Sequence, residues 1–187
     1  MRTRNKVALG SIVTILIVAG GVAGWLLRGP GTADPGPAVT AEAIRVGVPT
    51  IVSPAVLAAF AGNHYPVYWA GDRPHTTLEL TLTSGNAVFV RYLPAHAQVG
   101  DHQRYLTVAT YDNAVNSYAA LAGAKRNVAH VTHGRLGAVI AEFKRDPLST
   151  YFSFKGDGFQ VEVFSPDPGV SRHLTDIGAI KLVGSPR

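Results

Sequence analysis

Residues 76–83 alternate strictly between polar and apolar side chains, so that three leucines share one face of an extended chain. This period of two predicts a half-buried β-strand. The turn residues Ser84-Gly85-Asn86 follow, and a second strand is expected over 87–93. The two segments together predict a β-hairpin.

The length of this turn determines which side chains face each other. A three-residue turn places Glu79 opposite Arg91, whereas a two-residue turn would place Arg91 opposite Leu80, so the three-residue turn is favoured. Asn86 then takes the left-handed conformation that asparagine tolerates. As an exposed cross-strand pair, Glu79 and Arg91 are expected to contribute well under ~1 kcal/mol to the stability of the fold. The leucines are expected to pair as Leu78–Tyr92, Leu80–Val90 and Leu82–Val88.

Apolar residues at helical spacing predict three helices. The first follows the N-cap residue Ser53 and ends at Gly62. The second is expected to be capped by Asp112, to carry Val115 on its apolar face and to end by Arg126. The last opens at Pro166-Asp167-Pro168 and ends at Gly178.

The remaining apolar segments predict strands. Residues 136–143 fit a helix by spacing, but Gly134 and Gly137 disfavour one, so a strand is expected there. In the hairpin formed by 149–154 and 159–164, Glu162 is expected to face outward. Further strands are expected over 66–70, 105–111, 127–132 and 179–183. Because most strands follow one another through short turns, the predicted fold is α+β: one mainly antiparallel sheet with about three helices.

The N-terminus carries an uninterrupted apolar segment. Val7–Leu27 contains no charged residue, and 21 helical residues span about 31 Å, close to the bilayer core. Three basic residues precede it and only Arg28 follows, which places residues 1–6 in the cytoplasm and the C-terminal domain outside a cell membrane that the chain crosses once. The segment is longer than the apolar region of a cleaved signal peptide, so an uncleaved transmembrane signal-anchor is expected. Either interpretation exports the rest of the chain.

The segment after the anchor differs in composition from the rest of the chain. Residues 28–40 are rich in proline and glycine and predict a short extended stalk. Residues 41–187 then form one extracytoplasmic domain, which is long enough to bury a core without disulfides. The chain has no cysteine, which excludes thiolate metal sites and a cysteine nucleophile.

Net charge changes once the anchor is set aside. The whole chain carries +5, but from residue 29 onward 13 Lys and Arg face 12 Asp and Glu, leaving +1. Only Lys125-Arg126 and Lys144-Arg145 resemble basic clusters. A nucleic-acid partner is therefore not expected, because such binding needs clustered Lys and Arg.

Four segments taken together resemble a group of uncharacterised, membrane-anchored proteins of high-GC Gram-positive (actinobacterial) bacteria. The resemblance covers most of residues 60–183 and implies the same location and domain limits, but no activity. Twelve Arg against five Lys suit a GC-rich genome. The segments are PVYWAG (66–71), LELTLTSGNAVFVRYLP (78–94), YLTVATY (105–111) and FQVEVFSPDP (159–168).

Known catalytic and metal-binding motifs do not occur in the chain. His130 and His133 are the closest of seven histidines, but on a strand they point to opposite faces, so no metal site is expected. Nucleophile-elbow, phosphate-loop and dinucleotide motifs are absent, so neither a catalytic residue nor a cofactor is assigned. A triad assembled from distant residues stays open, because triads are defined by geometry.

The stretch HYPVYWAGDR (64–73) groups aromatic side chains with charged ones, a composition typical of recognition surfaces. The alternative is that its aromatic rings cover the edge of the core. The leading hypothesis is a non-catalytic binding module of the cell envelope, for a protein or another ligand; the alternatives are an envelope hydrolase and a structural or assembly subunit. The candidate binding residues are Tyr65, Tyr68, Trp69, Asp72 and Arg73.

Overall fold

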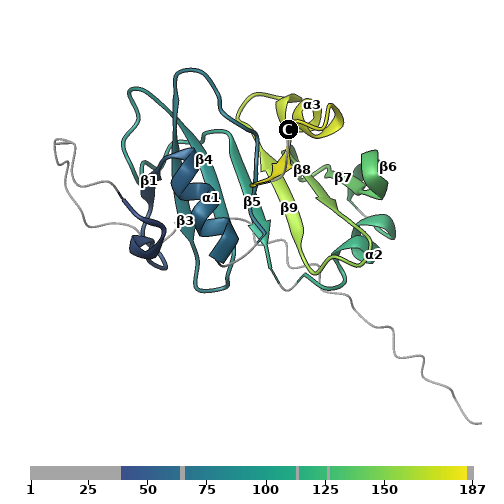
Figure 1. Ribbon diagram of the computed structural model, residues 1–187. Helices are drawn as coiled ribbons and strands as arrows, with labels where there is room; N and C mark the ends of the chain where they lie inside the picture. Colours follow the sequence, from purple (N-terminus) through teal and green to yellow (C-terminus); the bar gives the residue numbers. More distant parts are fainter. Residues whose placement is uncertain (1–38, 64–65, 113, 126, 185–187) are drawn as a thin grey trace, which may run out of the picture. The chain divides into compact units, whose positions relative to one another are not determined.

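The computed structural model in Figure 1 describes residues 39–63, 66–112, 114–125 and 127–184. The predicted anchor (7–27) and nearly all of the stalk lie outside these residues. Within the described ranges, no helix is long and apolar enough to cross a bilayer.

The domain is built on one eight-stranded sheet whose strands pair antiparallel, which confirms the prediction of a mainly antiparallel α+β fold. A separate pair is formed by β2 (Tyr68–Trp69) and β10 (Lys181–Leu182). In spatial order the sheet strands are β1 (Thr50–Val52), β3 (Thr76–Leu82), β4 (Val88–Pro94), β5 (Thr107–Tyr111), β9 (Gln160–Phe164), β8 (Asp146–Ser153), β7 (Val139–Phe143) and β6 (Val128–His133). The helices are α1 (Pro54–Asn63), α2 (Ser117–Ala122) and α3 (Val170–Asp176), with 3-10 turns η1 at Ala41–Ala43 and η2 at Arg135–Gly137.

The β3–β4 hairpin has the predicted register. Glu79 faces Arg91, and the three leucines face Tyr92, Val90 and Val88. The Thr83 amide donates to the Ala87 carbonyl at 2.9 Å across the turn, and Asn86 has φ 61°. The three-residue turn and the left-handed asparagine are both confirmed.

The first helix also begins where the sequence predicts. The Val56 amide donates to Ser53 Oγ at 3.2 Å, which satisfies one of the free N–H groups at the start of α1. Leu57 and Phe60 lie on its buried face. The helix ends one residue after Gly62, within the usual uncertainty of helix boundaries.

The second helix is shorter than predicted, and Asp112 does not cap it. The Ala114 amide donates to the Gly158 carbonyl at 2.8 Å, which holds the chain before α2 against the β8–β9 turn. The helix therefore begins only at Ser117, and Val115, expected on its apolar face, is 75% exposed. A contact between residues far apart in the sequence overrides the local capping preference here.

Residues 136–143 form a turn and a strand, which confirms the choice against a helix. Leu136 (φ 58°) and Gly137 (φ 76°) both have left-handed backbone conformations that a right-handed helix excludes. Strand β7 follows from Val139.

Strand register sorts the side chains onto two faces of the sheet. The first face carries the hairpin leucines and the valines of β4, β5 and β9, packed against Leu57 and Phe60 of α1. Figure 1 shows α1 lying along β3, β4 and β5 on this side. The second face carries Glu79, Arg91 and Glu162, and α2 covers only its β7–β8 part through Leu121. The larger apolar cluster thus lies on the first face, whereas the second combines a smaller apolar cluster with these charged side chains.

Candidate functional site

Tyr68, one of the sequence-predicted site residues, is a core residue. It is 8% exposed and its ring meets Phe152 edge-on at 5.6 Å and Phe159 at 5.5 Å. Its amide donates to Thr110 Oγ1 at 3.0 Å. Burial, with a smaller contribution from Asp157, raises the pKa of Tyr68 to about 12. The ring therefore holds β2 against the sheet.

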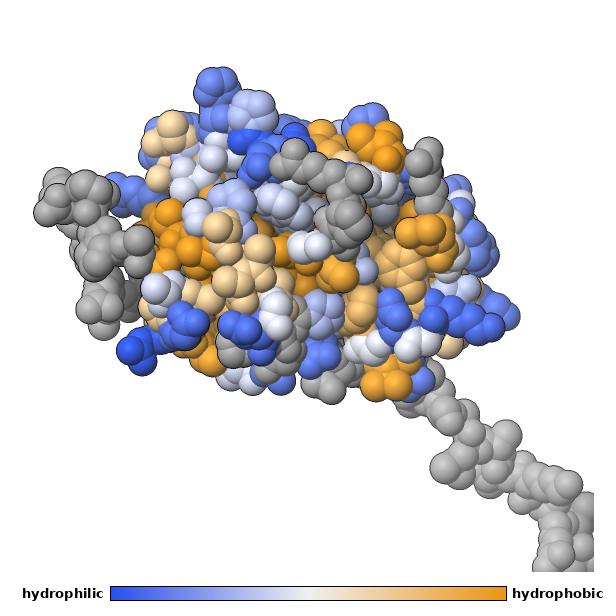
Figure 2. All heavy atoms as spheres, in the orientation of Figure 1, coloured by the Kyte–Doolittle hydropathy of each residue, from blue (hydrophilic) through white to orange (hydrophobic). Residues whose placement is uncertain are grey.

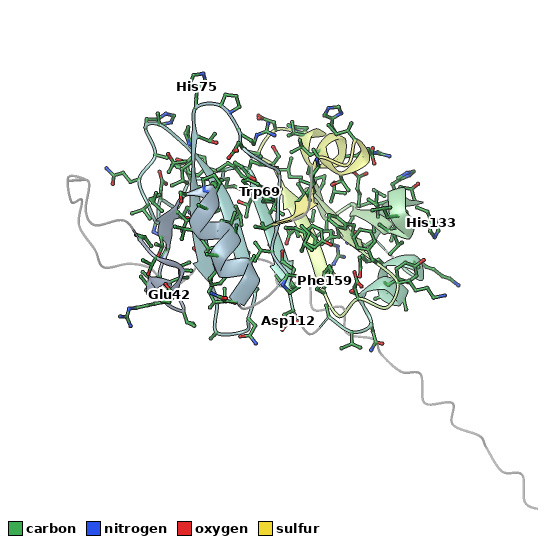
Figure 3. The ribbon with its side chains drawn as sticks, viewed as in Figure 1. Glu42, Trp69, His75, Asp112, His133 and Phe159 are labelled. Carbon is green, nitrogen blue, oxygen red and sulfur yellow. The ribbon has the colours of Figure 1, made fainter. Side chains whose placement is uncertain are left out.

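The other predicted residues lie nearer the surface. Trp69 is half-buried beside the core and pairs with Lys181 of β10; Figure 3 labels its position. Asp72 is exposed and Arg73 is half-buried. The Ala70 amide donates to Tyr92 Oη at 2.6 Å, which holds the residue after β2 against β4. Tyr65 lies outside the described residues.

The Glu79–Arg91 pair is buried, which corrects the expectation of an exposed pair. Glu79 has no exposed surface, and its Oε1 lies 2.6 Å from Arg91 Nη1. Its Oε2 accepts the Gly100 amide at 2.5 Å. Arg91 Nη2 donates to the carbonyls of Asp101 and Gln103 at 2.8 and 2.9 Å. The prediction failed because the chain after β4 folds back over this part of the second face.

The twelve-residue β4–β5 loop (residues 95–106) is thus tied to the sheet by an ion pair. Asp101 adds contacts within the loop: it accepts the Gln103 amide at 2.6 Å and the Tyr105 hydroxyl at 2.9 Å. These two hydrogen bonds hold the pKa of Asp101 below its usual value, and the bond from the Gln103 amide has the larger effect. The guanidinium of Arg91 lies 5.4 Å from the centre of the Tyr105 ring. The loop therefore has a defined conformation although it has no regular secondary structure.

A second group of polar side chains lies at the centre of the second face; we name it the hydroxyl–carboxylate cluster. Its members are Tyr111 of β5, Asp146, Ser149 and Tyr151 of β8, and Glu162 of β9. Glu162 accepts the hydroxyls of Tyr111 at 2.6 Å, Ser149 at 2.7 Å and Tyr151 at 3.2 Å. Tyr151 Oη also lies 2.5 Å from Asp146 Oδ2.

The environment of this cluster keeps its tyrosines protonated. Burial, and then the negative charge of Glu162, raise the pKa of both Tyr111 and Tyr151 above the usual value. The two hydroxyls therefore remain hydrogen-bond donors even above the pH at which an ordinary tyrosine loses its proton. Because Asp146, Tyr111 and Glu162 are each only half-buried, the cluster is accessible from solvent.

Aromatic rings flank the cluster on two sides. Phe89 of β4 meets Tyr111 edge-on at 5.9 Å. On the other side, the guanidinium of Arg104, from the β4–β5 loop, lies 4.6 Å from the centre of the Phe164 ring. The tied loop therefore brings a cation to the same face of the sheet as the two carboxylates.

The described part of the chain contains no group of three or more His, Asp or Glu side chains placed to hold a metal ion. His130 and His133 lie opposite Glu142 and Val139 in the β6–β7 pairing. Figure 3 shows His75 and His133 projecting from different parts of the domain. The six histidines of the described ranges are all exposed: His75, His96, His102, His130, His133 and His173.

No protein-family model, curated protein or solved structure matches this chain. Its function must therefore be inferred from its own residues.

The sequence pattern does not reveal the hydroxyl–carboxylate cluster and predicts only that Glu162 faces outward. One feature of the sequence pointed to part of the cluster: Ser149 and Tyr151 alternate along a strand with Thr150 and Phe152, so their hydroxyl groups share one face. Their meeting with Tyr111 depends on β5 pairing with β9. Pattern alone does not encode that pairing.

Proposed function

We propose that this protein is a non-catalytic binding module of the cell envelope, held at the membrane by residues 7–27, with residues 41–187 outside. We further propose that it binds its ligand on the second face of the sheet, where the β4–β5 loop meets the hydroxyl–carboxylate cluster. The observation that carries the proposal is the buried Glu79–Arg91 pair, which ties this loop to the sheet.

A buried ion pair is weak evidence for stability, since two well-packed apolar residues often do as well or better. What Glu79 and Arg91 do here is bind three backbone groups of the β4–β5 loop, at Gly100, Asp101 and Gln103. Ordered loops on a rigid scaffold carry binding residues more often than other segments. The pair therefore supports a loop whose conformation matters for recognition.

The chemistry of the surface favours a ligand with hydroxyl and carboxylate groups. Glu162 and Asp146 can accept hydrogen bonds from hydroxyls, and the guanidinium of Arg104 can pair with a carboxylate. The ring of Phe89 offers an apolar surface beside them. Soluble peptidoglycan fragments, which combine sugar hydroxyls with peptide carboxylates, are the probe that this chemistry suggests.

Thermal unfolding with and without these fragments tests the proposal. A ligand at ~100 times its Kd adds about 2.7 kcal/mol and raises Tm by about 5–10 °C for a domain of this size. Arg104→Ala and Glu162→Gln should each abolish the shift. Glu142→Gln, which changes a carboxylate on the first face, should leave it intact. Equal shifts in all variants would place the binding surface elsewhere.

A second candidate function, glycoside hydrolysis, is favoured by the spacing of two carboxylates. Tyr151 Oη lies 2.5 Å from Asp146 Oδ2 and 3.2 Å from Glu162 Oε1, so these two oxygens are less than about 6 Å apart. Retaining glycosidases hold their carboxyl groups about 5–5.5 Å apart, one acting as nucleophile and the other as acid and base.

Release of reducing sugar ends from peptidoglycan distinguishes the two functions. A binding module releases none above background. A hydrolase releases them at a rate that Glu162→Gln and Asp146→Asn each reduce by about 10²-fold or more. Loss of activity in only one of these variants would argue against the paired-carboxylate mechanism.

A further inference from the structure

Four of the large apolar side chains that the described domain exposes gather at the β1 edge of the sheet; we name them the β1 patch. They are Val46, Val48, Ile51 and Val99, each between 39% and 55% exposed. Arg45, also exposed, precedes them. Figure 2 shows hydrophobic residues gathered around the edge where β1 lies.

Contacts between the two segments place Val99 beside the stretch that contains Val48 and Ile51. Ile51 faces Glu79 across the β1–β3 pair, and Glu79 binds the Gly100 amide at 2.5 Å. A Cβ at Gly100 would lie 3.7 Å from Pro49 Cγ. Val99 of the β4–β5 loop therefore lies next to the segment that contains Val48 and Ile51, and the buried ion pair holds the two segments together.

The edge is poorly suited to pairing with a strand of another chain. β1 has only three residues and stands between Pro49 and Pro54, neither of which can donate to a ladder. Before β1, the Gly47 amide is already bonded to the Leu82 carbonyl at 2.7 Å. The accessible feature of this edge is thus its apolar side chains, which suit a surface that needs no backbone pairing.

Chain length places this edge within reach of a bilayer. The predicted span ends at Leu27, and the described domain begins at residue 39. The intervening proline-rich residues reach at most about 35–40 Å at ~3.1 Å per residue. Three residues of the β1 patch lie seven to twelve residues after the start of the described domain, and the β4–β5 loop brings Val99 next to them. A short tether keeps this surface at high effective concentration next to lipid.

We propose that the β1 patch docks on the lipid bilayer, with its valine and isoleucine side chains in the interfacial region and Arg45 at the headgroups. Small apolar surfaces with a cation partition into this region, and a tether turns such weak partitioning into stable docking. The inference rests on the proposed anchor. Docking would set the orientation of the domain above the membrane, and with it the accessibility of the second face.

Depth-dependent quenching on the full chain tests this directly, because the chain has no cysteine to remove. The full chain is reconstituted in vesicles of phosphatidylcholine and phosphatidylglycerol that contain lipids spin-labelled near the headgroup. A fluorophore is attached at Gln98→Cys, beside Val99, or at Ala122→Cys on α2 as a distant reference. Docking predicts stronger quenching at position 98 than at position 122.

Two double variants separate docking from general hydrophobicity. Val48→Ser with Val99→Ser should reduce quenching at position 98 to the reference level. Val115→Ser with Leu136→Ser removes two more exposed apolar side chains outside the patch, and should change nothing. Circular dichroism of each variant confirms that the domain is folded.

The outcomes distinguish docking from anchoring. If alkaline carbonate extracts the full chain from the vesicles, residues 7–27 do not anchor it and the proposed function fails. If the chain resists extraction but positions 98 and 122 are quenched equally, the anchor stands and docking is refuted. Disulfide crosslinking between two Gln98→Cys chains without lipid quenching would show that a second copy covers the patch, which also refutes docking.

Discussion

Glu79→Gln is the substitution whose effect the structure defines best. It removes the negative charge from a side chain with no exposed surface and leaves the guanidinium of Arg91, only 18% exposed, without its counter-ion. Removing one partner of a buried pair costs about 3–5 kcal/mol. Arg91 retains its carbonyl partners at Asp101 and Gln103. We therefore expect a loss of stability at the lower end of this range, about 3 kcal/mol, which corresponds to a fall in Tm of about 6–12 °C.

Urea unfolding of residues 39–187, followed by circular dichroism, measures this loss. The matched control is Glu142→Gln, whose partner Arg172 lies 3.2 Å away and is 43% exposed, so its loss should be under ~1 kcal/mol. Hydrogen exchange should quicken at the Gly100 amide in Glu79→Gln alone. A loss under ~1 kcal/mol for Glu79→Gln, equal to the control, would refute the inference that the pair is buried and holds the loop.

Four further predictions test the fold. Phe60→Ala opens the core beneath α1 and should cost about 3–5 kcal/mol in urea unfolding. Trp69→Ala, at the core edge, should cost about 1–2 kcal/mol yet leave a folded domain by circular dichroism; complete unfolding would make Trp69 a core residue. Leu136→Gly should raise stability by about 1 kcal/mol, because Leu136 is 92% exposed and strained at φ 58°; a loss would mean that its side chain has an unrecognised contact. The raised pKa of Tyr68 contributes stability that is complete below pH 10 and is lost as pH rises through about 12, so the urea midpoint should fall over this range, and less steeply in Tyr68→Phe.

The two faces of the sheet have different physical roles. The first face carries the larger of the two apolar clusters, which α1 and the β2–β10 pair bury and which accounts for most of the core. The second face places charged and hydroxyl groups on the same central strands, and α2 covers only one end of it. A stable first face leaves the second free to carry these polar groups.

Short-range sequence patterns correctly predicted several local elements of this protein. Strict alternation with three leucines on one face fixed the register of the β3–β4 hairpin, because a one-residue slip would turn every leucine outward. Ser53 and Pro54 located the start of α1, and the glycines around Leu136 correctly excluded a helix there. Each of these patterns involves residues close together in the sequence, so each element can be predicted from the local sequence alone.

Which polar residues are buried, and which lie together, depends on contacts between segments far apart in the sequence. Glu79 alternates like an exposed residue, and its burial results from the β4–β5 loop folding back over it. The hydroxyl–carboxylate cluster exists because β5 pairs with β9, some fifty residues further along the chain, which brings Tyr111 to Glu162. The physical reason is the same for both: alternation shows that two sets of side chains point to opposite faces, but which strands are neighbours and what covers each face depend on packing across the whole domain.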